Sequence, residues 1–228
     1  MKWIPIDFSA TPDFTDHYLI FPSAGCGNVD QLAIDLICFN YGKLIGRIIS
    51  DNLDFVASVN PFDSTSPILA SSIDAYLCEL PNLGKAVVLR VAANLPVQKR
   101  RILNYATELV EFMETTKIKA AIMIRSVPAL YCIDEQIKDW PVSIRGFGDA
   151  PKLFNIKKIE DYGDSQELVK LTVYGELYQC FSKITKIPFS ILFHFIHDGI
   201  GTRDAGICAS IVTSNKTLKV PPYWDTLQ

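Results

Sequence analysis

The segment His17-Tyr-Leu-Ile-Phe21-Pro-Ser-Ala-Gly-Cys-Gly27 runs directly into Asn28-Val-Asp-Gln-Leu-Ala-Ile-Asp-Leu-Ile-Cys-Phe39, and together they indicate the architecture of the chain. The first five residues have the length and composition of a strand. The second run places apolar residues at the i, i+3, i+4, i+7, i+8 spacing of a helix face, at Val29, Leu32, Ala33, Leu36 and Ile37. Because Lys43-Leu-Ile-Gly-Arg-Ile-Ile49 is strand-like again, the sequence predicts a strand, glycine turn, helix and strand in succession.

Polar residues mark the start of the predicted helix. Asn28 can accept a hydrogen bond from a free amide of the first helical turn. Gln31 follows three residues later, as in a capping box. We therefore expect Asn28 to cap this helix.

The glycine turn matches a dinucleotide-binding fingerprint at only two positions. Gly25 and Gly27 fit the first two glycines, but Asp30 stands where the third is needed. A carboxylate in the first helical turn occupies the favourable end of the helix dipole and repels a phosphate. Asp51 lies roughly 20 residues downstream, as a ribose-binding acid would, but acids are frequent and the match is weak. We interpret the two glycines as a tight turn and expect no cofactor.

Composition limits the classes of partner. The chain has 228 residues, 49% of them hydrophobic, which suits one α/β domain with a substantial core. Its net charge is −3 and its longest basic cluster is Lys99-Arg100-Arg101, so we expect no nucleic acid partner. No segment has the roughly 18 apolar residues of a membrane span, and the first residues lack the apolar core of a signal peptide. We therefore expect no membrane partner.

The cysteines lie far apart, without a Cys-x-x-Cys pair, and several fall within apolar runs. This pattern is typical of buried free thiols in an intracellular domain rather than of disulfides or a zinc site. The six residues are Cys26, Cys38, Cys78, Cys132, Cys180 and Cys208.

The rest of the chain alternates strand-like and helix-like segments. Strands are predicted over 55–59, 75–80, 85–91, 120–124 and 189–196, and helices over 99–115, 174–186 and from a capping Asp204 to about 215. Because Pro81-Asn-Leu-Gly84 joins two strands, a hairpin is expected there. The fold class is thus α/β, a single-domain three-layer sandwich with a mixed, largely parallel central sheet.

Charged, glycine and proline residues over 134–165 predict an irregular surface insertion. We divide the chain into a domain over 1–219 and a C-terminal tail over 220–228.

Few residues suggest chemistry. His194 and His197 would share a face on a helix but point to opposite faces on a strand, so with Asp198 they give no shared metal site if 189–196 is a strand. The loop over 197–203 follows the carboxyl end of that strand, where open α/β sheets bind ligands, although a glycine-rich connection is the alternative. The serines lack the Gly-x-Ser-x-Gly context of a nucleophile. We expect no catalytic residue.

The helix predicted over 99–115 carries basic residues at its amino end and acidic residues, Glu108, Glu111 and Glu114, toward its carboxyl end. This arrangement opposes the helix dipole, at a few tenths of a kcal/mol for each exposed charge. It indicates either a tolerated solvated face or a polarised face aimed at a partner.

Four short motifs carry a family resemblance. They are Gly27-Asn28-Val29, Gln31-Leu32-Ala33, Asp35-Leu36-Ile37 and Asn60-Pro61-Phe62. On these residues the chain resembles the proteasome assembly chaperone 2 family. Weaker matches are Tyr76-Leu-Cys-Glu-Leu80, the segments 86–91 and 99–115, and Phe195-Ile-His-Asp-Gly199 followed by Asp204-Ala205. Ile200 and Gly201 depart from the family's Asp-Asn, and residues of about 134–165 align poorly.

The resemblance implies a non-enzymatic chaperone with an α/β sandwich fold. Such a protein forms a heterodimer with a sister proteasome assembly chaperone, binds proteasome α-subunits and favours α-ring formation during 20S proteasome assembly, in the cytoplasm and also in the nucleus. The motif residues Gly27, Asn28, Gln31, Asp35, Asn60 and Pro61 are then structural. The alternative is a small-molecule or nucleoside-handling α/β enzyme, which would have a polar-lined pocket at 25–28 or 197–203.

The chain end departs from the family. Some members finish with a hydrophobic residue, a tyrosine and one more residue, which insert between α-subunits, whereas this chain ends in Thr226-Leu227-Gln228. Consecutive prolines are stiff and Trp224 can bury a large apolar area. We therefore expect the tail residues Pro221, Pro222, Tyr223 and Trp224 to pack on their own domain, with a partner contact as the alternative.

Overall fold

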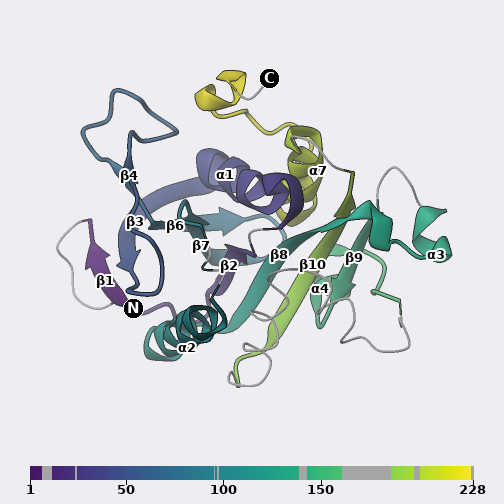
Figure 1. Cartoon of the computed structure of the whole chain (residues 1–228), viewed down its shortest axis with the longest axis horizontal. Coiled ribbons are helices and arrows are strands. Elements are labelled where there is room, and N and C mark those ends of the chain that lie inside the picture. The colour runs from purple at the N-terminus through teal and green to yellow at the C-terminus, as the bar shows by residue number, and fades with distance from the viewer. Residues whose placement is uncertain are drawn as a thin grey trace.

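A computed structural model describes residues 1–6, 12–23, 25–94, 96, 98–138, 143–160, 186–197 and 201–226. In this part of the chain, eight strands form one sheet with helices on both faces (Figure 1). In spatial order the strands are β1 (Lys2–Pro5), β3 (Gly42–Ile49), β6 (Ile73–Leu80), β7 (Gly84–Val91), β2 (Tyr18–Pro22), β8 (Ala120–Pro128), β10 (Phe189–Ile196) and β9 (Ser143–Phe147). A separate pair is formed by β4 (Ala57–Ser58) and β5 (Ala70–Ser71).

The sheet is mixed, as predicted, but it is not largely parallel, because four of the seven strand pairings in the described sheet are antiparallel. Parallel pairing is confined to β7, β2, β8 and β10, and antiparallel pairs flank this centre on both sides. The predicted hairpin joins β6 to β7, with Leu80 opposite Gly84. Gly84 has a φ of 73°, a left-handed conformation that glycine adopts without strain.

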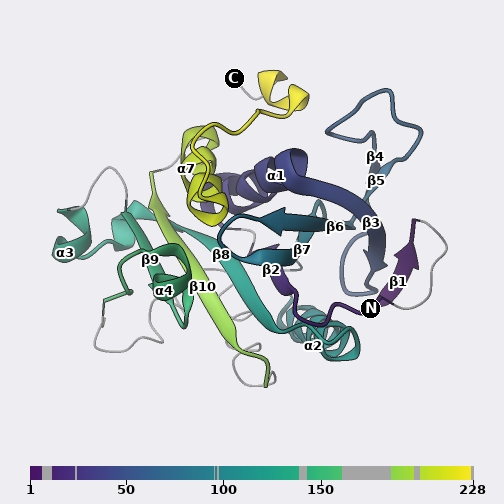
Figure 2. The ribbon, with the colours of Figure 1, turned by 180° about the vertical axis from the view of Figure 1, so that it is seen from behind.

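Three layers are present in the described part of the chain. Helices α1 (Val29–Tyr41) and α7 (Thr202–Thr213) cover one face of the sheet, and α2 (Lys99–Thr115) covers the other (Figures 1 and 2). Side chains of β2 alternate between the layers, since Leu19 and Phe21 pack in the core beneath α2 and Ile20 packs beneath α1. Each such fully buried side chain contributes about 1.5–3 kcal/mol of stability.

Most predicted elements are confirmed, with changes at their ends. Helix α2 and strand β10 have the predicted bounds, whereas the strand predicted over 55–59 is reduced to Ala57–Ser58. The prediction that Asp204 caps α7 is wrong, because the helix begins at Thr202 and Asp204 lies in its first turn, where a carboxylate favours the helix dipole. Residues 174–185 of the helix predicted over 174–186 lie outside the described residues.

The irregular insertion predicted over 134–165 is wrong for residues 143–154. Beyond the short helix α3 (Asp134–Ile137), β9 pairs with β10 as an edge strand and is followed by α4 (Ala150–Phe154). Arg145 is buried in this strand, with its Nε atom 2.6 Å from Glu160 Oε1. Arg145 makes the sequence of β9 look polar. The ion pair with Glu160 offsets the cost of burying the Arg145 guanidinium. Residues 161–165 lie outside the described part.

The five described cysteines are free thiols. Cys38, Cys78 and Cys208 are buried, Cys26 and Cys132 are partly buried, and Cys180 lies outside the described residues. Among the described helices, none has the length and apolar character needed to cross a membrane.

Candidate functional site

Asp30 closes the turn that leads into α1. This fully buried carboxylate accepts hydrogen bonds from the backbone N–H groups of Ser23 (3.0 Å) and Gly25 (2.7 Å). The hydroxyls of Ser23 and Ser126 also donate to it, over 3.2 Å and 3.3 Å. Burial raises the pKa of Asp30, and the hydrogen bonds from Gly25 and Ser23 oppose that rise. The carboxylate thus occupies the amide groups that a nucleotide-binding turn presents to a phosphate.

Asn28 does not cap α1, so that prediction is wrong. Its backbone is left-handed, with a φ of 55°, and its side chain makes no capping hydrogen bond. The preceding Gly27 is also left-handed, with a φ of 60°. Because a capping residue needs extended backbone to aim its side chain at the helix amides, this turn removes Asn28 from that role.

Gly25 is required by the approach of β8. A Cβ atom at this position would lie 2.5 Å from the backbone oxygen of Ser126 and still closer to its hydroxyl. The glycine therefore lets two segments of the chain meet, and it is not needed for approach to a ligand.

A row of alternating charges crosses three strands and reaches α1. Arg47 on β3 is paired with Asp74 on β6, and Asp74 with Arg90 on β7. Arg47 Nε lies 3.7 Å from Asp74 Oδ1, Arg90 Nη1 lies 3.8 Å from Asp74 Oδ2, and Arg90 Nε lies 2.9 Å from Asp35 Oδ1 on α1. Burial raises the pKa values of Asp35 and Asp74, while for Arg90 burial is outweighed by these two carboxylates, which raise its pKa. Two acids and two bases leave the row without net charge.

The tail attaches to this row. The Tyr223 hydroxyl, on the short helix η3 (Pro222–Thr226), donates a hydrogen bond to Asp35 Oδ2 over 2.5 Å. Trp224 is 5% exposed and packs in the core cluster of α1 and α7, and Pro221 is buried while Pro222 is exposed. In Figure 1 the tail lies above α1 and α7. The described tail therefore lies against its own domain.

Asn40 holds the segment before η3. Its Nδ2 atom donates to the Lys219 backbone oxygen and its Oδ1 atom accepts from the Lys219 backbone N–H, each over 2.8 Å. The Asn40 side chain thus pairs with both backbone groups of Lys219, as a neighbouring strand would. This pairing is a second point at which the C-terminal segment is attached to α1.

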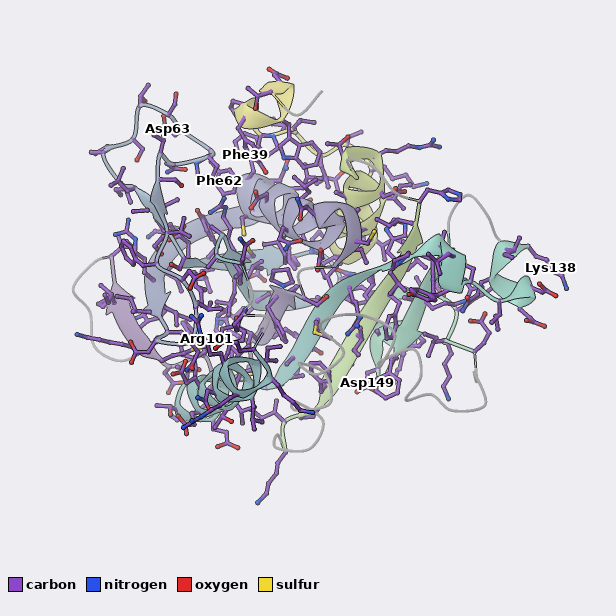
Figure 3. All side chains as sticks on the ribbon, viewed as in Figure 1. Phe39, Phe62, Asp63, Arg101, Lys138 and Asp149 are labelled. Carbon is purple, nitrogen blue, oxygen red and sulfur yellow. The ribbon has the colours of Figure 1, made fainter. Side chains whose placement is uncertain are left out.

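The Asn60-Pro61-Phe62 motif packs beside the charged row. Asn60 Oδ1 accepts a hydrogen bond from the Phe62 backbone N–H over 2.9 Å, which closes a turn around Pro61. Phe62 and Phe39 of α1 are labelled close together in Figure 3, and their ring centroids are 5.7 Å apart. The Arg90 guanidinium lies 5.9 Å from the centroid of the Phe62 ring. Motifs that are distant in sequence therefore meet at Arg90.

A cavity of about 520 Å³ lies beside this cluster, at the carboxyl end of β7. Such ends are where open α/β sheets commonly bind ligands. Helix α1, the end of β7 and the tail provide its lining, which is Gly27, Asn28, Gln31, Leu32, Asp35, Arg90, Val91, Ala92, Ala93, Asn94 and Tyr223. Four of the six predicted motif residues thus share one cavity, while Asn60 and Pro61 lie outside its lining.

The chain is similar in sequence to two known proteins. No protein-family model matches the chain. It is 24% identical over 220 residues to proteasome assembly chaperone 2 of Mus musculus, covering 86% of this chain and 80% of that protein. It is 27% identical over 135 residues to proteasome assembly chaperone 2 of Danio rerio, covering 58% of this chain and 51% of that protein. The chain resembles the proteasome assembly chaperone 2 family.

The fold agrees with this resemblance. The crystal structure of Pyrococcus furiosus PbaA, described as an archaeal homolog of proteasome-assembly chaperone, matches with a TM-score of 0.64 at 14% identity. The match covers 93% of this chain and 85% of PbaA. The mixed eight-stranded sheet with its two helical layers is therefore a fold that a proteasome-assembly chaperone homologue also has.

The residues that connect the chaperone motifs were not predicted. Arg47, Asp74 and Arg90 each stand between apolar or small residues in their strands, and charged side chains in such places need partners when they are buried. That signal could have identified the three residues. It could not have identified Asp35 as the partner of Arg90.

The two predicted histidines do not come together. His194 is fully buried on β10, with its Nε2 atom 3.7 Å from Asp204 Oδ1, whereas His197 is exposed beyond the end of that strand. In the described part of the chain, no group of three metal-ligating side chains was found. Residues 198–200 of the predicted pocket loop, including Asp198, lie outside the described residues.

Two of the charges on α2 have partners within the domain. Glu108 accepts hydrogen bonds from the Ser50 hydroxyl (2.5 Å) and from Asn52 Nδ2 (2.8 Å). Arg101 lies 3.1 Å from Asp54 Oδ1. Glu108 and Arg101 thus bind the segment that follows β3. Contacts within the domain therefore account for these two of the charges on α2.

A second hollow, an apolar groove of about 470 Å³, is lined by residues of β1, β3 and β5 and of the segment between β3 and β5. Four exposed apolar side chains line it, namely Ile4, Ile49, Phe55 and Leu69. Phe55 is 78% exposed, which is unusual for a phenylalanine, and such patches often mark protein contacts.

Proposed function

We propose that this chain is a proteasome assembly chaperone that acts by binding and not by catalysis. The observation that carries the proposal is the 24% identity to mouse proteasome assembly chaperone 2 over 220 residues. The likeness in fold to PbaA, over 93% of the chain, supports the same proposal.

In this proposal the chain forms a heterodimer with a sister proteasome assembly chaperone. The pair binds proteasome α-subunits and favours α-ring formation in 20S assembly, in the cytoplasm and in the nucleus. Neither nucleic acid nor a membrane takes part. The exposed side chains of Phe55 and Leu69 support recognition of a protein, because interface cores are formed by accessible apolar groups.

A second candidate, a small-molecule enzyme, is favoured by the cavity beside Gly27 and Asn28. Its polar lining is the feature that this alternative requires. However, Asp35 forms an ion pair with Arg90 and accepts a hydrogen bond from Tyr223, and none of the described lining residues is a histidine, cysteine or serine. Groups engaged in this way are poorly placed for acid–base or nucleophilic work, which favours binding.

Co-expression with the sister chaperone tests the heterodimer. Alone, the chain should self-associate through its exposed apolar groups; with the sister, it should elute as a one-to-one complex in size-exclusion chromatography. A monodisperse monomer that ignores the sister protein would overturn this part of the proposal.

Affinity capture from native cells, followed by mass spectrometry, tests the partners. α-Subunits should be enriched over β-subunits, and both cytoplasmic and nuclear fractions should give the same set. For the enzyme alternative, incubation with a mixture of nucleosides and mass spectrometry of the products is decisive, because turnover without α-subunit capture would favour catalysis.

A further inference from the structure

Two residues that line the cavity between α1 and the end of β7 have buried polar atoms whose lack of a hydrogen bond the chaperone role leaves unexplained. Gln31 Oε1 is buried and has no hydrogen-bond partner among the described residues. Arg90 Nη1 is also buried and makes no hydrogen bond to the described part of the chain, since Asp74 Oδ2 is 3.8 Å away. Both residues line the cavity. Buried polar atoms are seldom left unpaired, so a missing donor and a missing acceptor are indicated.

The charges around the cavity favour a neutral occupant. Asp35 uses one oxygen for Arg90 and the other for the Tyr223 hydroxyl. The positive charge of Arg90 is matched by Asp35 and Asp74, and Arg47 matches the remaining acid. An anion would be repelled by the Asp35 carboxylate and a cation by the Arg90 guanidinium. Neither would find an opposite charge in the row that is not already paired.

The walls favour a small molecule with an apolar body. Leu32, Val91, Ala92 and Ala93 provide apolar surface around the polar atoms. The volume of about 520 Å³ lies within the range of ligand sites.

We propose that this cavity binds a small neutral amide. The amide N–H donates to Gln31 Oε1, the amide carbonyl accepts from Arg90 Nη1, and the attached apolar group packs on Leu32 and Ala92. A carboxamide carries this donor and acceptor side by side, whereas a carboxylate lacks the donor and a ketone lacks it too. The amide can belong to a free metabolite or to an asparagine or glutamine side chain of a protein.

Three probes of equal size separate these requirements: benzamide, benzoate and acetophenone. Ligand-observed saturation-transfer NMR on the purified protein, alone or with its co-purified partner, should detect benzamide, and its affinity should exceed that of the other two by about tenfold. Equal binding of benzamide and acetophenone would overturn the proposal, as would no binding of benzamide.

Variants of the lining residues test whether benzamide binds in this cavity. Gln31→Leu should lower the affinity for benzamide by about tenfold, because it removes the hydrogen-bond acceptor. Gln98→Leu is the matched control, since Gln98 is exposed and makes no capping bond to α2. If Gln31→Leu does not fold, Ala92→Leu serves instead, because it narrows the cavity and leaves the polar atoms in place. Unchanged benzamide binding in the folded variant would overturn the proposal.

Competition distinguishes the two sources of the amide. The peptides acetyl-Ala-Gln-Ala-dimethylamide and acetyl-Ala-Leu-Ala-dimethylamide differ only in the central side chain, and the dimethylated C-terminus of each lacks an amide N–H. Displacement of benzamide by the glutamine peptide alone supports an amide from a protein, and displacement by neither supports a free molecule. Displacement by both peptides equally would overturn recognition of a carboxamide side chain and of the small amide together.

Discussion

The hydroxyl of Tyr223 donates a hydrogen bond to Asp35 across a sequence separation of 188 residues. The same carboxylate holds Arg90, so the tail, α1 and β7 share one anchoring group. Burial raises the pKa of Tyr223, and the Asp35 charge raises it further, so the phenol stays protonated and remains a donor. Tyr223 of the tail is therefore part of the same hydrogen-bonded cluster as the motif residue Asp35.

Trp224→Ala should lower stability by about 3–5 kcal/mol, because it removes a large side chain from the core. Thermal unfolding of the purified protein measures the change. Deleting residues 226–228 is the control, and it should leave both the melting temperature and α-subunit capture nearly intact. If the deletion abolished capture while Trp224→Ala changed nothing, the tail would instead be an insertion anchor.

Arg90→Met should lower stability by about 3–5 kcal/mol near neutral pH, since Asp35 and Asp74 would keep buried charges without their shared base. The pKa values of both acids are already raised by burial, so they protonate readily as the pH falls. The loss should therefore shrink on acidification. Urea unfolding at several pH values tests this, with Lys85→Met, an exposed change on the same strand, as the control.

His194 should make the protein sensitive to acid. Burial lowers its pKa to about 4, so the unfolded chain binds a proton that the folded chain excludes. This contribution to stability, at most about 3 kcal/mol, is present above about pH 6.5 and is lost as the pH falls toward about 4.

His194→Gln should flatten the slope of unfolding free energy against pH over that window. Asp204, at 3.7 Å, has a pKa that burial raises, so its protonation acts in the opposite direction and is common to both proteins. The difference between wild type and variant isolates the histidine. An identical slope in both would contradict the assignment, and His17→Gln controls for a histidine that is not fully buried.

Local patterns predicted the elements but not their long-range contacts. The helix face of α1 and the apolar strands β7 and β10 could be predicted because burial imposes a period on neighbouring residues. Strand β9 was missed because its buried Arg145 is paired with Glu160, which lies 15 residues away. The cap at Asn28 was mispredicted because a left-handed turn redirects its side chain.

The candidate site was predictable only as separate pieces. The family motifs identified Asp35 and Gln31, but nothing local joins them to Arg90 or to Tyr223. Those contacts depend on the order of β6 and β7 in the sheet and on the return of the tail over α1. A side chain's neighbours across a sheet follow from topology, which a single sequence specifies only weakly.

Two glycine substitutions should act in opposite directions. Gly25→Ala forces a Cβ atom against the backbone of Ser126 and should destabilise the protein by several kcal/mol or prevent folding. Gly206→Ala, inside α7, meets no atom within 4 Å and should stabilise by about 1 kcal/mol. Chemical denaturation compares them. A stable Gly25→Ala protein would contradict the close contact with β8.

Calorimetric titration with ATP, GTP or NAD should give no binding tighter than about millimolar, with or without magnesium. Asp30 already accepts the Gly25 N–H that a phosphate would need. Micromolar affinity for any of the three would contradict this assignment and would revive the enzyme alternative.

The turn before α1 carries its own counter-ion. In nucleotide-binding proteins, a comparable turn is completed by a phosphate that arrives and departs, and the two states of the turn can transmit a signal. Here the acceptor is covalently part of the chain and cannot depart, so the arrival and loss of a phosphate cannot switch this turn. In the proposed assembly role, a nucleotide cycle at this helix is therefore not available to reset the protein between rounds.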